Sequence, residues 1–176
     1  QQTAEFAGVK DWKEDTDAAR CARHFVKRLL ARLVFLHFLQ KKRWLGCSPV
    51  SAPRWDDGDT DFLRHLFQAC RSPDRFHTTC LIPLFYETLN SRRKDDLFKP
   101  NGSPRAAAVR IPYLNGGLFE ENSVEKAFRT FDFPADRFEH LFDFFSRFNF
   151  TIDESDPLDV EIGVDPEMLG RIFEAL

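Results

Sequence analysis

The sequence predicts a mainly α-helical domain, bundle-like in organisation, with one or two short β-hairpins or strand pairs. Long stretches place apolar residues at helical spacing, which is the main sequence signal for amphipathic helices. The apolar inventory is dominated by 20 Phe, against one Met and two Tyr. An Asn-Gly pair between apolar flanks indicates a tight turn. We expect residues 1–14 to be an N-terminal extension and residues 15–176 to form a single helical domain.

The strongest helical pattern covers residues 15–44. Its apolar face consists of Ala22, Phe25, Val26, Leu29, Leu33 and Leu36. Acidic residues in the first turn and basic residues in the last match the helix dipole, and Gly46 is expected to end the helix. The apolar run at 33–39 is much shorter than the roughly 20 residues that span a bilayer, so it predicts a buried helix and no membrane partner.

Two further helices are expected before residue 91. Asp59 or Thr60 is a suitable N-cap for the second helix. Its apolar face consists of Phe62, Leu63, Leu66, Phe67 and Cys70. A third helix is predicted over 76–90, kinked or begun afresh at Pro83 because proline lacks the backbone N–H.

The middle of the chain predicts loops and short extended segments. Residues 91–105 are polar and predict a mobile surface loop. Residues 109–119 predict a hairpin that turns at Asn115-Gly116-Gly117, and residues 131–133 a brief strand. Pro134 suits the first position of a fourth helix. Its apolar stripe consists of Phe138, Leu141, Phe142, Phe145 and Phe148.

The last 13 residues, 164–176, predict a helix. Asp165 is a good N-cap, and Pro166 suits the first helical position. The apolar face consists of Leu169, Ile172, Phe173 and Leu176. Because the chain stops on that face without a C-terminal signal, we expect the helix to be truncated at residue 176 and the chain to be a piece of a larger protein.

No complete catalytic, cofactor or metal site is expected. Cys70, His77 and Cys80, like Cys21 and His24, fall beside apolar residues, so we interpret them as buried cysteines and surface histidines rather than zinc ligands. The acidic run at 153–161 is interpreted as a solvated loop, because it lacks the acid-x-Lys triplet of magnesium nucleases. Nucleophile motifs and phosphate-binding glycine loops do not occur.

Basic residues are the best candidates for binding. The net charge of −3 argues against coating nucleic acid by bulk electrostatics, but local basic faces could contact a phosphate backbone. The candidates are Arg20, Arg23, Lys27 and Arg28 on the first helix, and Arg92, Arg93 and Lys94 in the loop. The alternative is an ordinary solvated face. Four cysteines are too few for a secreted disulfide scaffold, which favours a cytoplasmic protein.

Four segments carry a family resemblance: residues 81–90, 111–120, 148–155 and 164–174. In order and spacing they resemble the region just upstream of the catalytic core in large bacterial adenine-specific DNA methyltransferases. That group includes the single-chain type IIG restriction-modification enzymes and related phage-defence methyltransferases. The resemblance covers about residues 20–176 and implies a helical connector between an N-terminal region, often a nuclease, and the methyltransferase domain.

The resemblance also implies what the parent protein does and needs. The parent would methylate adenine N6 after flipping the base, using S-adenosylmethionine, and Mg²⁺ where a nuclease is present. The family's cofactor glycines and Asn-Pro-Pro-Tyr motif are absent here, so no catalytic residue is carried over. Partners would be the flanking methyltransferase and nuclease domains and, in the full-length protein, duplex DNA. Six residues of these segments are expected to have a structural role: Asn115, Gly116, Gly117, Asp165, Pro166 and Gly170. For the glycines that role is to let a tight turn pack closely against its neighbour.

Two other functions stay open. A stand-alone helical module could bind a protein partner through its Phe-rich face. An autonomous nuclease is the weaker alternative, and it would depend on acidic residues such as Asp153 and Glu161.

Overall fold

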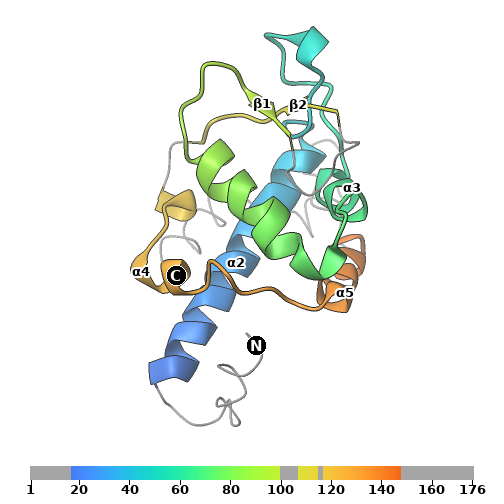
Figure 1. The fold of residues 1–176 in the computed structure, drawn as a ribbon. Coiled ribbons are helices and arrows are strands. Elements are labelled where there is room, and N and C mark those ends of the chain that lie inside the picture. Colours follow the sequence, from blue (N-terminus) through green and yellow to red (C-terminus); the bar gives the residue numbers. More distant parts are fainter. Residues whose placement is uncertain (1–16, 100–106, 115–116, 148–176) are drawn as a thin grey trace, which may run out of the picture.

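The computed structural model describes residues 17–99, 107–114 and 117–147, and the helical prediction is confirmed (Figure 1). A long helix, α2 (Asp17–Lys41), runs diagonally through the molecule, and the other helices pack around it. Within the described ranges the one sheet has two antiparallel strands. Helix α2 is buried almost all round in its second half, where the sequence is most apolar. No helix in the described part of the chain combines the length and apolar character needed to cross a bilayer.

Helix α2 ends three residues earlier than predicted. Arg43, with φ of 60°, occupies the left-handed position directly after the helix end, and Gly46, with φ of 72°, follows three residues later. The N–H of Trp44 donates to Leu39 O (3.1 Å) and that of Arg43 to Gln40 O (2.9 Å), which is the Schellman pattern of a helix C-terminus. The spacing pattern could not show this, because a glycine usually fills that position.

Helices α3 (Phe62–Gln68) and α5 (Ala135–Phe145) contact each other beside α2. The face predicted for α3 is buried, and on α5 the predicted residues Phe138, Phe142 and Phe145 are buried while Leu141 is partly buried. Asp59 Oδ1 accepts from the Asp61 N–H (2.8 Å) just before α3. Pro134 precedes the first residue of α5 rather than occupying it. A short 3₁₀ turn, η2 (Pro73–Arg75), leads into the third predicted helix.

The third helix is a π-helix, which the sequence did not predict. Segments η3 (His77–Leu81) and η4 (Pro83–Leu89) meet at Ile82, so Pro83 does stand at the first position of the second segment. The N–H of Ile82 donates to His77 O, and that of Asn90 to Phe85 O at 3.1 Å, each five residues back. Neither bond uses the N–H that proline lacks.

The predicted hairpin is wrong. Strand β2 (Val109–Arg110) pairs with β1 (Leu97–Phe98), which lies inside the segment expected to be only a loop. Beyond the turn, the described residues form a 3₁₀ helix, η5 (Gly117–Phe119), and then helix α4 (Ser123–Ala127). The chain leaving β2 is tied instead to η4, since the Leu114 N–H donates to Leu89 O (2.8 Å).

The brief strand expected at 131–133 is also wrong. These residues have no partner strand among the described residues. Asp132 instead accepts from the backbone N–H and the hydroxyl of Thr78, at 2.9 Å each. Predictions for residues 1–14, Asn115, Gly116, 148–163 and the last helix, with Asp165, Pro166 and Gly170, lie outside the described residues.

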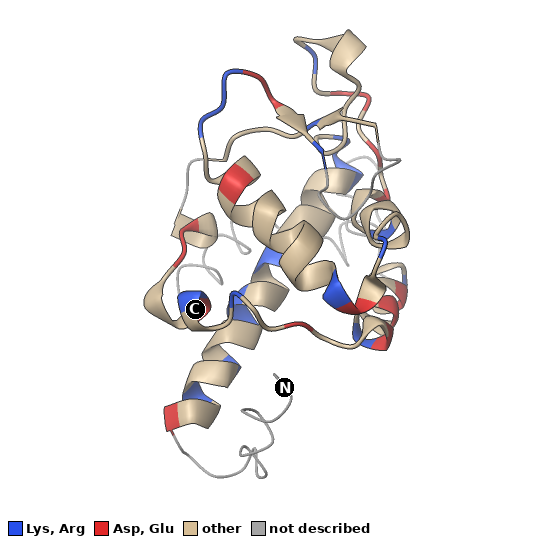
Figure 2. Ribbon diagram, viewed as in Figure 1, with Lys and Arg blue, Asp and Glu red and all other residues tan. Residues whose placement is uncertain are grey.

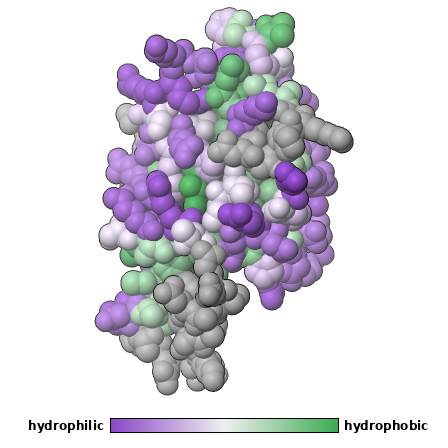
Figure 3. All heavy atoms as spheres, viewed as in Figure 1, coloured by the Kyte–Doolittle hydropathy of each residue, from purple (hydrophilic) through white to green (hydrophobic). Residues whose placement is uncertain are grey.

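The surface is mostly hydrophilic in the view of Figure 3, with an apolar patch at the projecting tip. That tip is formed by a 3₁₀ turn, η1 (Pro49–Ser51), where Val50 is 93% exposed. The tip returns to the body through Gly58, whose N–H donates to Arg43 O at 3.0 Å.

Replacing Gly58 with alanine should destabilise the protein. A Cβ at Gly58 would clash with the carbonyl of Arg43 and lie 2.5 Å from that of Leu45, both backbone atoms that cannot move aside cheaply. Overpacking of this kind costs about 1–3 kcal/mol, measurable by urea denaturation. The matched control is Gly117→Ala, because no atom lies within 4 Å of its Cβ position. Equal losses in the two variants would contradict the prediction.

The stability of the protein should fall as the pH drops below about 6.5. Burial and the nearby charge of Lys41 lower the pKa of His37 to about 4. In the unfolded chain His37 takes up a proton near pH 6.5, whereas in the folded protein it does so only near pH 4. The neutral His37 therefore contributes its full stability above pH 6.5, and this contribution is lost progressively as the pH falls from about 6.5 to about 4. In denaturation series at pH 7, 6 and 5, His37→Gln should show a smaller loss than the wild type. An unchanged slope would contradict this assignment.

Candidate functional site

A buried ion pair lies where α2 meets the segment after η5. Arg32 of α2 is 1% exposed and Glu125 of α4 is 2% exposed. Arg32 Nη1 lies 2.5 Å from Glu125 Oε1, and Arg28 Nε lies 3.4 Å from Glu125 Oε2. Neither contact is aligned as a hydrogen bond, so both act as ion pairs. A carboxylate this deeply buried is tolerated only with such partners.

The two arginines also bind the backbone of residues 117–120. Arg32 Nε donates to Leu118 O (2.7 Å) and its Nη2 to Glu120 O (3.1 Å). Arg28 Nη2 donates to Glu120 O (3.0 Å) and Gly117 O (3.3 Å). Carbonyl oxygens thus satisfy the N–H groups that Glu125 does not engage, as buried charged groups require.

A third element, η4, reaches the same place through Tyr86. Arg32 Nη1 donates to the Tyr86 hydroxyl at 2.8 Å. The guanidinium carbon lies 5.2 Å from the Tyr86 ring centre, 5.3 Å from that of Phe85 and 5.8 Å from that of Phe119. Burial raises the pKa of Tyr86, so its hydroxyl stays protonated. We call Arg28, Arg32, Tyr86, Glu125 and the 117–120 backbone the arginine cluster.

Glu125 also caps the helix that carries it. The Glu125 N–H donates to Asn122 Oδ1 (2.9 Å), and the Asn122 N–H donates to Glu125 Oε2 (3.1 Å). This reciprocal pair is a capping box. Our sequence reasoning missed both helix α4 and Glu125, although Asn122-x-x-Glu125 was the signal that could have found them.

The arginine cluster joins segments that are far apart in the sequence. Two of them, 81–90 and 111–120, carry the family resemblance, and the others are α2 and α4. The charged groups of the cluster are paired with one another, Glu125 with both arginines, and none has a neighbouring group that would activate it as a general acid, base or nucleophile. The arrangement is suited to fixing geometry rather than to chemistry.

The expected close packing of the Gly-Gly turn is not found at Gly117. This residue is exposed, and a side chain there would meet nothing within 4 Å. Its carbonyl oxygen, rather than its missing Cβ, is what the arginine cluster uses.

The candidate phosphate contacts on α2 do not all face solvent. Arg20 and Lys27 are exposed and Arg23 is half-buried. Arg28 points into the arginine cluster, with 18% of its side chain exposed. A helical wheel shows the direction of a side chain but not what covers it, so the sequence could not separate Arg28 from its neighbours.

The loop candidates lie at the other end of the molecule (Figure 2). Arg93 donates to the carbonyls of Leu97 and Ile111, the latter at 2.8 Å, and burial lowers its pKa. Arg92 is exposed and stacks over Tyr113 at 5.4 Å, and Lys94 is exposed. The structure therefore does not bring the two predicted basic faces together, and DNA contact remains a prediction.

The sulfur and imidazole groups that we weighed as metal ligands have other partners. His77 is buried, not on the surface as expected, and its Nδ1 lies 2.6 Å from Phe131 O. The Cys70 thiol donates to Ser72 O at 3.3 Å. Cys21 is exposed, whereas Cys70 and Cys80 are buried as predicted. Over the described ranges, no three Cys, His, Asp or Glu side chains gather closely enough to hold a metal ion.

Comparison with known proteins gives one informative similarity. The chain is 30% identical over 155 residues to a protein of Methanocaldococcus jannaschii named "Putative type II restriction enzyme and methyltransferase". The match covers 86% of this chain but only 12% of that protein. No family model and no solved structure matches the chain. The similarity relates the chain to a restriction-modification protein.

Proposed function

We propose that this chain is a non-catalytic helical spacer of an N6-adenine DNA methyltransferase of the restriction-modification type. In that role it holds the methyltransferase domain, and a nuclease domain where one is present, in position on DNA. The observation that carries the proposal is the similarity to the M. jannaschii protein, which extends over 86% of the chain within a protein about eight times longer than the matched stretch. S-adenosylmethionine, and Mg²⁺ for a nuclease, would be bound by the neighbouring domains.

The arginine cluster supports a mechanical role. A spacer transmits position only if its parts move together, and Arg32 ties α2, η4 and the 117–120 turn at a single buried point. A buried polar network favours one arrangement over its alternatives where its members are paired, as Arg32 is with Leu118, Tyr86 and Glu125. Duplex DNA would be a partner of the full-length protein, and its phosphates would meet exposed basic residues such as Lys27, Arg92 and Lys94.

Transfer of a radioactive methyl group to duplex DNA by the full-length protein tests the proposal. Arg32→Lys retains the charge but cannot hold several carbonyls in one plane, so it should lower the methylation rate while S-adenosylmethionine affinity stays unchanged. Arg64→Ala, which removes an exposed ion pair with Asp143, should leave both quantities unchanged.

Two results would overturn the proposal. One is stoichiometric binding of S-adenosylmethionine to the 176-residue chain alone in calorimetry. The other is a full-length protein whose next ~150 residues lack both motifs of such methyltransferase cores, the Phe-Tyr-Thr-Pro motif expected first and the Asn-Pro-Pro-Tyr motif that holds the flipped adenine, because a core of ordinary domain size would begin there.

A further inference from the structure

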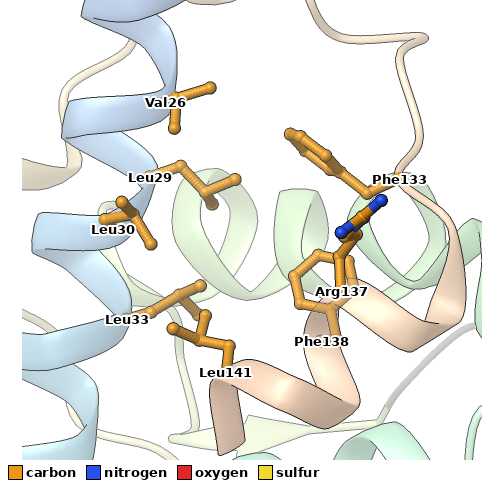
Figure 4. A pocket seen from close by; sticks show the side chains of 8 residues that line it. All are labelled: Val26, Leu29, Leu30, Leu33, Phe133, Arg137, Phe138 and Leu141. Atoms are coloured by element: carbon orange, nitrogen blue, oxygen red, sulfur yellow. The ribbon is translucent and has the colours of Figure 1, made fainter. Parts of the chain in front are cut away.

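An apolar groove lies between α2 and α5 (Figure 4). Figure 4 shows four aliphatic side chains of α2 facing Phe133, Phe138 and Leu141 across it. The α2 side is formed by Val26, Leu29, Leu30 and Leu33. The hollow has a volume of about 150 Å³, and Arg137 is the one charged residue that lines it. Leu30 at its edge is 41% exposed.

The sequence contains a segment with a matching pattern. Leu169, Ile172, Phe173 and Leu176 repeat at the same spacing as the four α2 residues of the groove: first, fourth, fifth and eighth. Both sets span seven helical steps, which is about 10.5 Å at 1.5 Å per residue. Two helices with apolar stripes of equal length can pack along each other with their ridges interlocked.

The fit extends to shape and charge. Phe173 is the one aromatic residue in the 164–176 stripe, and a cavity of roughly 150 Å³ accommodates a benzene-sized group. Asp165 precedes Leu169 by one turn on the same helical face and is opposite in charge to Arg137 at the groove. Polar Glu167, Arg171 and Glu174 lie on the other side of that helical wheel, where a docked helix would face solvent.

The tether between groove and segment is long enough. Helix α5, which forms one wall, ends at Phe145, and residue 164 follows 19 residues later. At about 3.3 Å per extended residue such a tether reaches about 60 Å, far more than a groove on α5 itself requires. Because the segment belongs to the same chain, its effective concentration near the groove is high.

We propose that residues 164–176 dock as a helix in the α2–α5 groove, with Phe173 filling the hollow. The segment that leaves this domain is then anchored to the domain's own surface, and it leaves at a fixed angle. This docking does not depend on the proposed spacer function, because it concerns contacts within the chain alone.

Hydrogen exchange of the 176-residue chain, read by mass spectrometry, tests the docking. Amides of residues 169–176 should be protected in the wild type. Protection should fall about tenfold or more in Leu30→Asp and in Ile172→Asp, because each puts a charge into an apolar contact. Leu97→Asp is the matched control, since Leu97 on β1 is 40% exposed and lies away from the groove, and it should retain the protection. Ile172→Asp changes the docking segment and leaves α2 intact, so it keeps the test valid if Leu30→Asp destabilises the helical domain itself.

Three outcomes would overturn the proposal. The first is exchange of residues 169–176 at the intrinsic rate in the wild type. The second is equal protection of the residue 169–176 amides in Leu30→Asp and in Leu97→Asp, whether that protection is high or low in both. The third is protection that rises with protein concentration, which would make a second copy the occupant. This experiment measures hydrogen exchange and not methylation. Failure of the docking proposal can therefore be distinguished from failure of the spacer proposal.

Discussion

Phe76→Ala should lower the free energy of unfolding by about 3–5 kcal/mol, the range found for buried aromatic residues. The Phe76 ring is 0% exposed. It meets the Phe67 ring edge-on at 5.1 Å and the Phe138 ring at 5.0 Å, so one ring joins the third helix to both α3 and α5. Truncation removes the buried area and leaves a cavity among rigid rings that cannot collapse. Urea denaturation followed by circular dichroism measures the loss.

Phe144→Ala provides the control for this prediction. Phe144 lies on α5 and is 52% exposed. Its removal should change stability by no more than about 0.5 kcal/mol, as is usual for surface positions. A loss below about 1 kcal/mol for Phe76→Ala would show that the aromatic core adjusts to the missing ring.

Helices α2, α3 and α5 could be predicted because the spacing of their apolar residues indicates them directly. The faces of α2, α3 and α5 repeat every three to four residues, and the residues predicted at Phe25, Leu63 and Phe142 are buried. Periodicity reports which side of a helix is covered, and that information is local. The Phe-rich core follows directly from those faces.

The parts that were missed depend on partners far away in the sequence. β2 pairs with a strand 12 residues upstream across a polar segment, and nothing in the Val109–Arg110 dipeptide indicates it. The π form of the third helix is not encoded in a spacing rule. The hairpin at Asn115-Gly116-Gly117 failed because a local turn signal does not show that the chain on one side is already tied to η4.

The arginine cluster is the clearest case of non-local information. Arg32 and Glu125 are 93 positions apart, and each alone resembles an ordinary charged residue of an amphipathic helix. Arg32 occurs within the apolar face of α2, between Leu29 and Leu33, which was a sign that its charge must be matched inside the core. Sequence alone could not name the partner.

Replacing Arg32 with methionine should lower the free energy of unfolding by about 3–5 kcal/mol, although methionine is apolar and fits a buried site. The loss arises because removal of one member of a buried pair leaves the other charge uncompensated. Of its two ion pairs Glu125 would retain only the 3.4 Å contact with Arg28, and the Leu118 carbonyl would lose its 2.7 Å donor. Guanidinium chloride would screen the ion pair, so urea denaturation is the suitable measurement.

A second variant separates the charge from the hydrogen bonds. In Arg32→Met combined with Glu125→Gln, the stranded carboxylate is gone, but the carbonyls of Leu118 and Glu120 still lack the hydrogen bonds that Arg32 donates. The double variant should therefore recover part of the loss and not all of it. Arg129→Ala, which removes an exposed arginine that pairs with Glu121 at 2.5 Å, should cost no more than about 1 kcal/mol. If Arg32→Met cost as little as Arg129→Ala, the cluster would not hold the three segments together, and the mechanical argument for the spacer would lose its support.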